Sequence, residues 1–255
     1  MFEISEKNKN SKFQSASNPE FSGSQQLLDS EVGLIRYTSD IVAMFYKQLN
    51  LKKHVKEDKG RVLEFGAGTG FLAQLFEENF GIRPDCVELD PVLAQLNLDK
   101  GFNCFRFLKD SKQDYTAIYT SNVLEHIEDD EGVLSELFSA LISGGGLAIY
   151  VPAHAFLFTK MDYEVGHVRR YGKTELKSKV SEAGFRIESL NYADSLGFFA
   201  TLLVKIIGYR GTGDLGSSKS LLLYDRFIFP ISKSLDRLGA RYFIGKNLIL
   251  IARKP

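Results

Sequence analysis

The stretch Glu64-Phe-Gly-Ala-Gly-Thr-Gly70 sets the architecture of this chain. It follows the short β-rich run 61–65 and precedes apolar residues at helical spacing between 69 and 80, so it predicts a strand-to-helix turn. Glycine in such a turn lets the backbone take positive φ and approach a ligand closely. The N–H groups of the first helical turn are then available to that ligand.

The spacing of the glycines and a nearby acid narrow the ligand class. A dinucleotide loop follows G-x-G-x-x-G, and that pattern would need glycine where this chain has Phe71. Glu64 lies two residues before the first glycine, where a carboxylate suits a cationic ammonium group better than a pyrophosphate. S-adenosylmethionine (SAM), an amino acid joined through a sulfonium to adenosine, is such a ligand. Glu88 ends the next predicted strand, where an acid can accept both ribose hydroxyls; Asp90 is a rival, or else begins the following helix.

Strands alternate with helices on both sides of this loop. We therefore predict a doubly wound, Rossmann-like α/β fold with a mostly parallel seven-stranded sheet and a helical cap inserted before the last strand. The predicted strands are 61–65, 85–89, 103–108, 115–120, 147–151, 185–192 and 246–252. The predicted helices are 29–51, 69–80, 91–100, 129–142 and 174–183, with 143–146 as a glycine-rich stop.

The predicted domain organisation is simple. Residues 1–28 form a polar, flexible segment without the apolar region of a secretory signal, and 29–255 form one domain. Residues 194–245 are too long for an ordinary connection. They contain the apolar stretch 196–209, the linker 211–218 and a second amphipathic stretch.

Composition excludes several classes of protein. Lys and Arg equal Asp and Glu in number, so the formal net charge of zero argues against nucleic-acid binding. The four histidines are widely spaced, and we expect no metal site. The two cysteines, Cys86 and Cys104, are expected to be free thiols. No apolar run reaches the length of a bilayer span, so we expect a cytoplasmic protein.

With these features the sequence resembles the class I SAM-dependent methyltransferases. The resemblance rests on the glycine loop, on Glu88, on Ser121-Asn-Val-Leu-Glu-His126 and on the turn and strand at 145–151. It implies that Glu64 and the loop hold the methionine part of SAM, that Glu88 holds the ribose, and that other residues flank the adenine or pass under the sulfonium. The implied cofactor-binding residues are Glu64, Gly66, Ala67, Gly68, Gly70, Glu88, Leu89, Leu108, Asp110, Asn122, Val123 and Leu124. One departure is Tyr115-Thr-Ala-Ile118, because the family commonly carries Asp after this Tyr.

Three further segments resemble a narrower branch, the methyltransferases found beside glycosyltransferases in bacterial polysaccharide pathways. These segments are Val151-Pro-Ala-His-Ala155, Asp162-Tyr-Glu-Val-Gly-His-Val-Arg-Arg-Tyr171 and the closing 245–253. The branch implies a saccharide-type small-molecule acceptor, including a lipid-linked one.

A hydroxyl acceptor needs a base to take its proton as it attacks the methyl group. His167 is the first candidate and His126 the second; the alternative for His167 is a loop residue that bonds a carbonyl. His154 and Tyr171 are expected to contact the acceptor. Arg169 and Arg170 either bind an anionic acceptor or pair with nearby acids, Asp162 and Glu164.

Other interpretations stay open at this stage. The fold can also serve a non-catalytic binding or regulatory module, whereas Phe71 and Glu64 argue against a nicotinamide-dependent dehydrogenase. The apolar run 196–207 either packs into the core or touches a membrane surface or a lipid-linked substrate.

Overall fold

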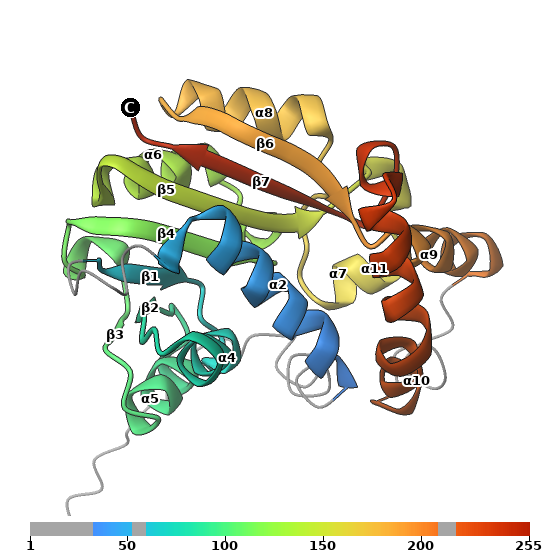
Figure 1. The fold of residues 1–255 in the computed structure, drawn as a ribbon, viewed down its shortest axis with the longest axis horizontal. Helices are drawn as coiled ribbons and strands as arrows, with labels where there is room; N and C mark the ends of the chain where they lie inside the picture. The colour runs from blue at the N-terminus through green and yellow to red at the C-terminus, as the bar shows by residue number, and fades with distance from the viewer. Residues whose placement is uncertain (1–32, 53–59, 209–217) are drawn as a thin grey trace, which may run out of the picture.

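A computed structural model describes residues 33–52, 60–208 and 218–255 (Figure 1). The predicted N-terminal segment 1–28 and the linker residues 211–217 lie outside this range. The described chain forms one seven-stranded sheet in the order β3-β2-β1-β4-β5-β7-β6, in which only β7 runs antiparallel to its neighbours. The strands are β1 Val62–Phe65, β2 Asp85–Val87, β3 Cys104–Phe105, β4 Tyr115–Ser121, β5 Leu141–Pro152, β6 Arg186–Ala193 and β7 Asn247–Arg253. The predicted fold class is therefore confirmed.

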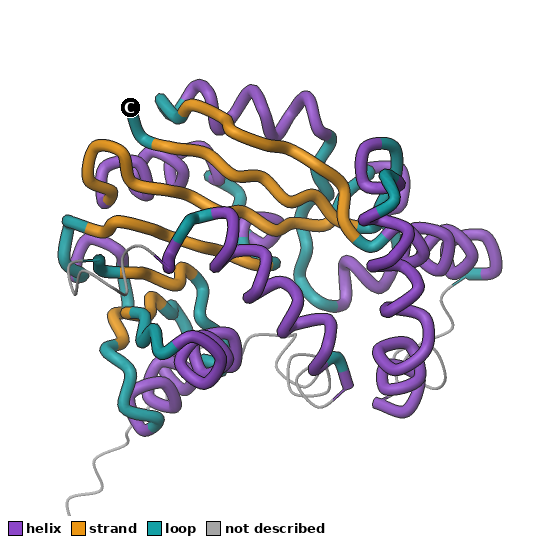
Figure 2. Tube along the Cα trace, viewed as in Figure 1, coloured by secondary structure: helices purple, strands orange, loops and turns teal. Residues whose placement is uncertain are grey.

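Helices cover both faces of the sheet (Figure 2). On one face, α6 and α8 pack against a core built around Leu134, Leu137 and Leu176. On the other face, α2 and α4 pack through Phe45 and Phe76 against β1, β4 and β5. The bounds of these four helices and of α5 are as follows: α2 Ile35–Gln48, α4 Phe71–Phe80, α5 Pro91–Asp99, α6 Asp130–Ala140 and α8 Lys173–Glu182.

Side-chain caps set where two of these helices begin. The Asp90 carboxylate accepts hydrogen bonds from the backbone N–H groups of Val92 and Leu93, at 2.8 and 3.0 Å, and so caps α5. Asp129 caps α6 in the same way through Gly132. Of the two roles considered for Asp90, the structure shows helix capping.

The prediction that the glycine-rich segment 143–146 ends the helix before β5 is wrong, because this segment lies within the strand. The strand already begins at Leu141, because α6 ends at Ala140 and Leu141 has extended backbone angles. The pairing of β4 with β5 shifts register between Tyr115 and Ala117, so several residues of β5 bulge outward there. Small residues permit this bulge, and Gly144 has a φ of 78°.

The cap lies between β6 and β7 in the chain. Its elements are α9 Ser195–Ile207, α10 Ser218–Leu223, a π-helical turn η4 Tyr224–Ile228, α11 Phe229–Arg237 and η5 Ala240–Tyr242. Figure 1 places them beyond the carboxyl ends of β4 and β5, the edge of an α/β sheet at which ligands bind. No helix within the described ranges is long and apolar enough to cross a membrane.

The cap is tied to α2, the first helix of the described residues. The carboxylate of Asp225, which is 6% exposed, accepts hydrogen bonds from the backbone N–H groups of Arg36 and Tyr37 at 3.1 and 2.8 Å. It thereby caps α2, whose own N-cap residue, Leu34, offers no side-chain acceptor. A Lys233–Asp40 ion pair joins the same two elements.

We predict that Asp225→Ala lowers the free energy of unfolding by about 1 to 2 kcal/mol, because α2 loses its cap. Thermal or urea denaturation measures this change. Asp225→Asn is the matched control, since its amide oxygen still accepts a hydrogen bond, and it should lose much less. Equal stability of Asp225→Ala and the natural protein would mean that this contact does not hold the cap to α2.

Candidate functional site

The glycine loop joins β1 to α4 and has the backbone geometry that its sequence predicts. Gly66, Gly68 and Gly70 have φ values of 76°, 55° and 81°, a region that side-chain-bearing residues rarely adopt. A Cβ atom on Gly66 would lie 2.3 Å from a methyl carbon of Val123, and one on Gly70 would lie 2.4 Å from Oδ1 of Asn97. The loop is therefore pressed between the segment after β4 and helix α5, and only glycine fits.

Glu88 fastens the same loop to the end of β2. Its Oε2 accepts a hydrogen bond from the Gly68 N–H at 2.7 Å, and its Oε1 accepts one from the Asp90 N–H at 2.8 Å. Burial raises the pKa of this carboxyl above its ordinary value, against the effect of these two bonds. The backbone N–H groups of Gly66 and Ala67 also bind the Val87 carbonyl. The predicted ribose ligand and the predicted methionine loop are thus brought together.

The side chain of Glu64 is buried beneath the glycine loop and is not exposed to solvent. Its side chain is 3% exposed, and its carboxylate accepts hydrogen bonds from the Tyr119 hydroxyl, at 3.0 Å, and from the Ala73 N–H in the first turn of α4. Burial raises the pKa of Glu64 to about 8, although these two bonds lower it. A buried acid under a helix N-terminus first of all holds the loop and α4 in place.

The remaining predicted cofactor residues surround the same edge of the sheet. Asn122, directly after β4, has a φ of 53° and donates its N–H to the Tyr150 carbonyl, so the chain turns sharply there. Val123 contacts Gly66, and Leu124 is fully buried. Leu89 is 63% exposed beside the loop. Leu108 and Asp110 belong to the turn η1 Leu108–Asp110, with Leu108 buried and Asp110 exposed.

The two histidines proposed as bases lie against each other. His126 ends the turn η2 Leu124–His126, and His167 follows the short helix α7 Lys160–Glu164. Their ring centroids are 4.7 Å apart in an edge-to-face arrangement. The Val168 N–H donates to the Glu125 carbonyl at 2.8 Å, which holds the two segments side by side. The wide spacing of the histidines along the chain did not indicate that the fold brings these two together.

Asp162 orients His167. Its Oδ1 lies 2.9 Å from Nδ1 of His167 and 2.8 Å from Nε of Arg170. Burial of Asp162 would raise its pKa, but the hydrogen bond from His167 and the charge of Arg170 hold it at about 2. The carboxylate is thus ionised and fixes the tautomer of His167 in which Nδ1 carries the hydrogen. A histidine oriented by a carboxylate is the arrangement of a general base.

His126 is a weaker base than its position suggests. Burial and the neighbouring His167 lower the pKa of His126 to about 4, despite its contact with the Gly166 carbonyl. Near neutral pH it is uncharged and takes a proton poorly. Its Nδ1 lies 3.1 Å from the Gly166 oxygen.

The four residues predicted to contact the acceptor have structural partners. Tyr171 is fully buried and donates its hydroxyl to Asp130 at 2.7 Å, so it cannot reach an acceptor, and that prediction is corrected. Arg170 pairs with Asp162, as the alternative reading expected, whereas Arg169 pairs with Asp130 at 2.8 Å. His154 stacks on Tyr192 and contacts the Gly245 carbonyl, so it joins the cap to the sheet.

Sequence reasoning missed a second polar group under the cap. The hydroxyls of Tyr37 and Tyr150 lie 2.8 Å apart, and both accept hydrogen bonds from the side-chain amide of Asn247. Asp194, at the start of the cap, has a φ of 62° and accepts bonds from the hydroxyls of Tyr224 and Ser232. These six residues belong to different elements or connections spread along the chain, and no local motif marks them.

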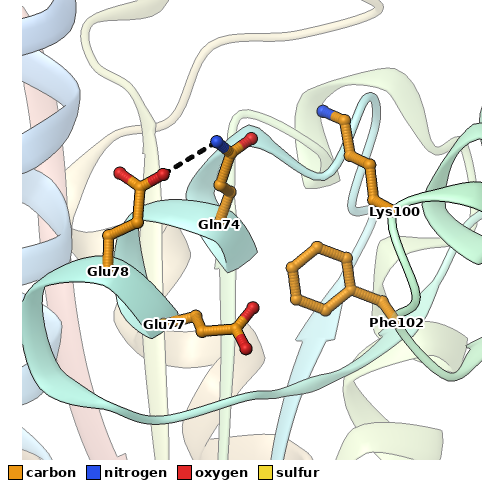
Figure 3. A pocket seen from close by; sticks show the side chains of 5 residues that line it. All are labelled: Gln74, Glu77, Glu78, Lys100 and Phe102. Atoms are coloured by element: carbon orange, nitrogen blue, oxygen red, sulfur yellow. Dashed lines mark hydrogen bonds between the residues drawn. The ribbon is translucent and has the colours of Figure 1, made fainter.

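A surface hollow on the α4 and α5 side does not coincide with this site. It is lined by Gln74, Glu77, Glu78, Lys100 and Phe102, and Figure 3 shows the Gln74–Glu78 hydrogen bond at its rim. None of the predicted cofactor or catalytic residues lines it. Most of the residues predicted to bind the cofactor gather instead at the carboxyl ends of β1, β2 and β4.

Solved structures with a similar fold include enzymes of different chemistry. One is described as a sarcosine dimethylglycine methyltransferase from Galdieria sulphuraria, with 17% identity, a TM-score of 0.54 and coverage of 85% of this chain and 84% of that one. Geranyl diphosphate C-methyltransferase from Streptomyces coelicolor A3(2) has 12% identity and a TM-score of 0.54, over 85% and 77% of the two chains. The cyclase SpnF has 17% identity and the same TM-score, over 85% and 81%. At these identities the likeness shows the fold alone.

The family follows from the sequence. No curated protein matches the chain. Residues 37–190, which contain the glycine loop, Glu88 and both clustered histidines, match the methyltransferase domain family. Because this match covers more than half of the chain and agrees with the fold and the loop geometry, the chain belongs to that family and is a SAM-dependent methyltransferase.

Proposed function

We propose that this enzyme methylates an oxygen atom of a saccharide-type small molecule that is linked to a lipid. The observation that carries the choice of oxygen is the Asp162–His167 hydrogen bond of 2.9 Å. Amine and carboxylate acceptors attack a sulfonium methyl group with little help, whereas a hydroxyl must lose its proton. A histidine oriented by an ionised carboxylate, next to the segment after β4, supplies that function.

The proposed cofactor contacts follow the arrangement around the loop. When bound, SAM supplies an electrophilic methyl group. We assign the methionine part to the glycine loop and Glu64, the ribose to Glu88, the adenine to Leu89, Leu108 and Asp110, and the sulfonium to the segment 122–124. The two oxygens of Glu88 already accept backbone N–H groups, and each keeps a lone pair for a ribose hydroxyl.

The surface of the cap supports the lipid-linked acceptor. More than half of the exposed large apolar side chains in the described residues lie in the cap. Four of them form one stripe along α9, each more than half exposed: Phe199, Leu203, Ile206 and Ile207. A second set recurs at helical spacing from the end of α10 through η4 and α11 to the residue after α11, each more than half exposed: Leu223, Phe227, Ile231 and Leu238. Apolar surface of this extent marks an interaction site.

The charges of the cap favour an anionic membrane as the partner. Its exposed charged residues in the described ranges 194–208 and 218–245 are all cations: Lys205, Lys219, Arg226, Arg237 and Arg241. The acids of the same ranges, Asp194, Asp225 and Asp236, accept hydrogen bonds within the protein. Apolar side chains flanked by cations bind the interface of anionic lipids. We therefore infer that the cap rests on the membrane surface that carries the acceptor.

We predict that Gly68→Arg weakens SAM binding at least 100-fold, because a side chain at a φ of 55° strains the loop and fills it. Calorimetric titration with SAM measures this. Gly81→Arg is the matched control: its φ is 66°, but a side chain there meets no atom within 4 Å. That variant should carry similar strain and bind SAM normally. Equal affinities in the two variants would place the cofactor elsewhere.

We predict that His167→Ala lowers kcat by about 100-fold or more, because the hydroxyl keeps its proton, while the Kd for SAM changes little. The measurement is release of S-adenosylhomocysteine with an acceptor found by screening saccharides and lipid-linked sugars. His154→Ala removes a histidine outside the cluster and should retain most of the activity. Full activity of His167→Ala would mean that His167 is not the base and has only a structural role.

We predict that the protein floats with vesicles of anionic lipid in a sucrose gradient, and that the double variant Ile206→Ser, Leu238→Ser reduces this binding by at least about 100-fold, since each buried side chain contributes about 1.5 to 3 kcal/mol. Val92→Ser, a change of an equally exposed apolar residue on α5, serves as control. Failure of the natural protein to float, or its self-association through the same residues in light scattering, would contradict the proposal.

A further inference from the structure

Glu125, His126 and His167 form a cluster of possible metal ligands, of which the proposed function uses only His167. One potential ligand atom of each residue lies within 4.8 Å of those of the other two. Glu125 and His126 come from η2, directly after β4, and His167 comes from the loop after α7. Two hydrogen bonds to backbone carbonyls hold the two segments together: one from the Val168 N–H to Glu125 and one from the His126 ring Nδ1 to Gly166.

The Glu125 side chain is the unusual member of this cluster. It is fully buried, and neither of its carboxylate oxygens has a hydrogen-bond partner within the described structure. Burying a carboxylate without a partner is costly. The charge of Arg170 acts on Glu125, but its Nε pairs with Asp162 at 2.8 Å and its buried Nη1 has no hydrogen-bond partner within the described structure. A bound cation would satisfy both oxygens of Glu125.

Both histidines present the tautomer that a metal ion requires. A carbonyl oxygen can only accept, so the contact between His126 Nδ1 and the Gly166 oxygen places the hydrogen on Nδ1 and the lone pair on Nε2. The ionised Asp162 has the same effect on His167. Nε2 of His167 lies 3.8 Å from Oε1 of Glu125. Metal-binding histidines typically donate their second N–H to a carboxylate or a carbonyl in this way.

We infer that Glu125, His126 and His167 bind one divalent transition-metal ion, of the Zn²⁺ or Mn²⁺ class, beside the methyl-transfer site. Two imidazoles and one carboxylate suit these ions, whereas Mg²⁺ and Ca²⁺ prefer oxygen ligands throughout. Ligand atoms around one tetrahedral ion at ~2.1 Å lie roughly 3.4 Å apart. The cluster therefore needs only a modest inward rotation of its side chains. Three protein ligands leave at least one position open, as in catalytic sites.

The inference deepens the proposed oxygen methylation and rests on it for its role. The acceptor hydroxyl occupies the open position of the ion, which lowers the pKa of that hydroxyl, and its proton leaves to solvent. The oxygen then forms a bond to the methyl carbon, the carbon–sulfur bond breaks, and its electron pair stays on sulfur. The products are the methyl ether, S-adenosylhomocysteine and a proton. In this arrangement His167 holds the ion, and Asp162 is a positioning residue.

The test is metal binding to the full-length protein after removal of metal with a chelator. Titration with Zn²⁺, and separately with Mn²⁺, is followed by calorimetry without SAM or acceptor. We expect one ion per chain, at least 100-fold weaker binding in Glu125→Gln, and a 10- to 100-fold loss in Asp162→Asn. His154→Gln is the matched control and should bind like the natural protein. Normal SAM affinity of Glu125→Gln verifies that this variant folds.

The possible outcomes distinguish a failure of the metal site from a failure of the proposed oxygen methylation. No stoichiometric binding, or equal binding by Glu125→Gln, overturns the metal site; if the stripped protein then still methylates a hydroxyl at the full rate, the proposed function stands with His167 as the base. Stoichiometric binding that Glu125→Gln abolishes supports the site even if no hydroxyl acceptor is found. In that case the oxygen chemistry is wrong and the metal site remains.

Discussion

The close approach of Val123 to Gly66 is the contact on which the site depends. A side chain at Gly66 would collide with it at 2.3 Å, so the segment after β4 can lie against the loop after β1 only because that residue is glycine. This approach positions the loop and Glu88 on one side and Glu125 and His126 on the other. The residues that we propose to bind the cofactor and those that we propose to handle protons therefore share this one contact.

Asp162 organises the second half of the site. It is almost fully buried and accepts hydrogen bonds from Thr159, His167 and Arg170. This carboxylate thus caps the start of α7 through Thr159, orients His167 and pairs with the charge of Arg170. Removing its charge would leave Arg170 buried without a partner, so function and stability are coupled at this residue.

The sequence predicted the sheet, its order of elements and the loop because these are local patterns. Alternating strands and helices and the three glycines can be recognised within a few residues, and Glu88 follows from the length of one α/β unit. The cluster of Glu125, His126 and His167 could not be predicted in this way, because it depends on the register between two loops. Tyr171 was misassigned for a related reason: its position in a loop motif does not reveal that its side chain turns into the core.

The hydrogen bonds by which Asp225 caps the N-terminus of α2 have a consequence for folding during synthesis. Asp225 follows Tyr37, whose N–H it binds, by 188 residues. During synthesis from the N-terminus, the first described helix therefore waits with open N–H groups until most of the chain has left the ribosome. The domain closes last where its two ends meet, and loop closure over such a distance is slow. A nascent chain that stops before the cap leaves an unfinished helix end and the apolar faces of α2 and β5 exposed to chaperones or to aggregation.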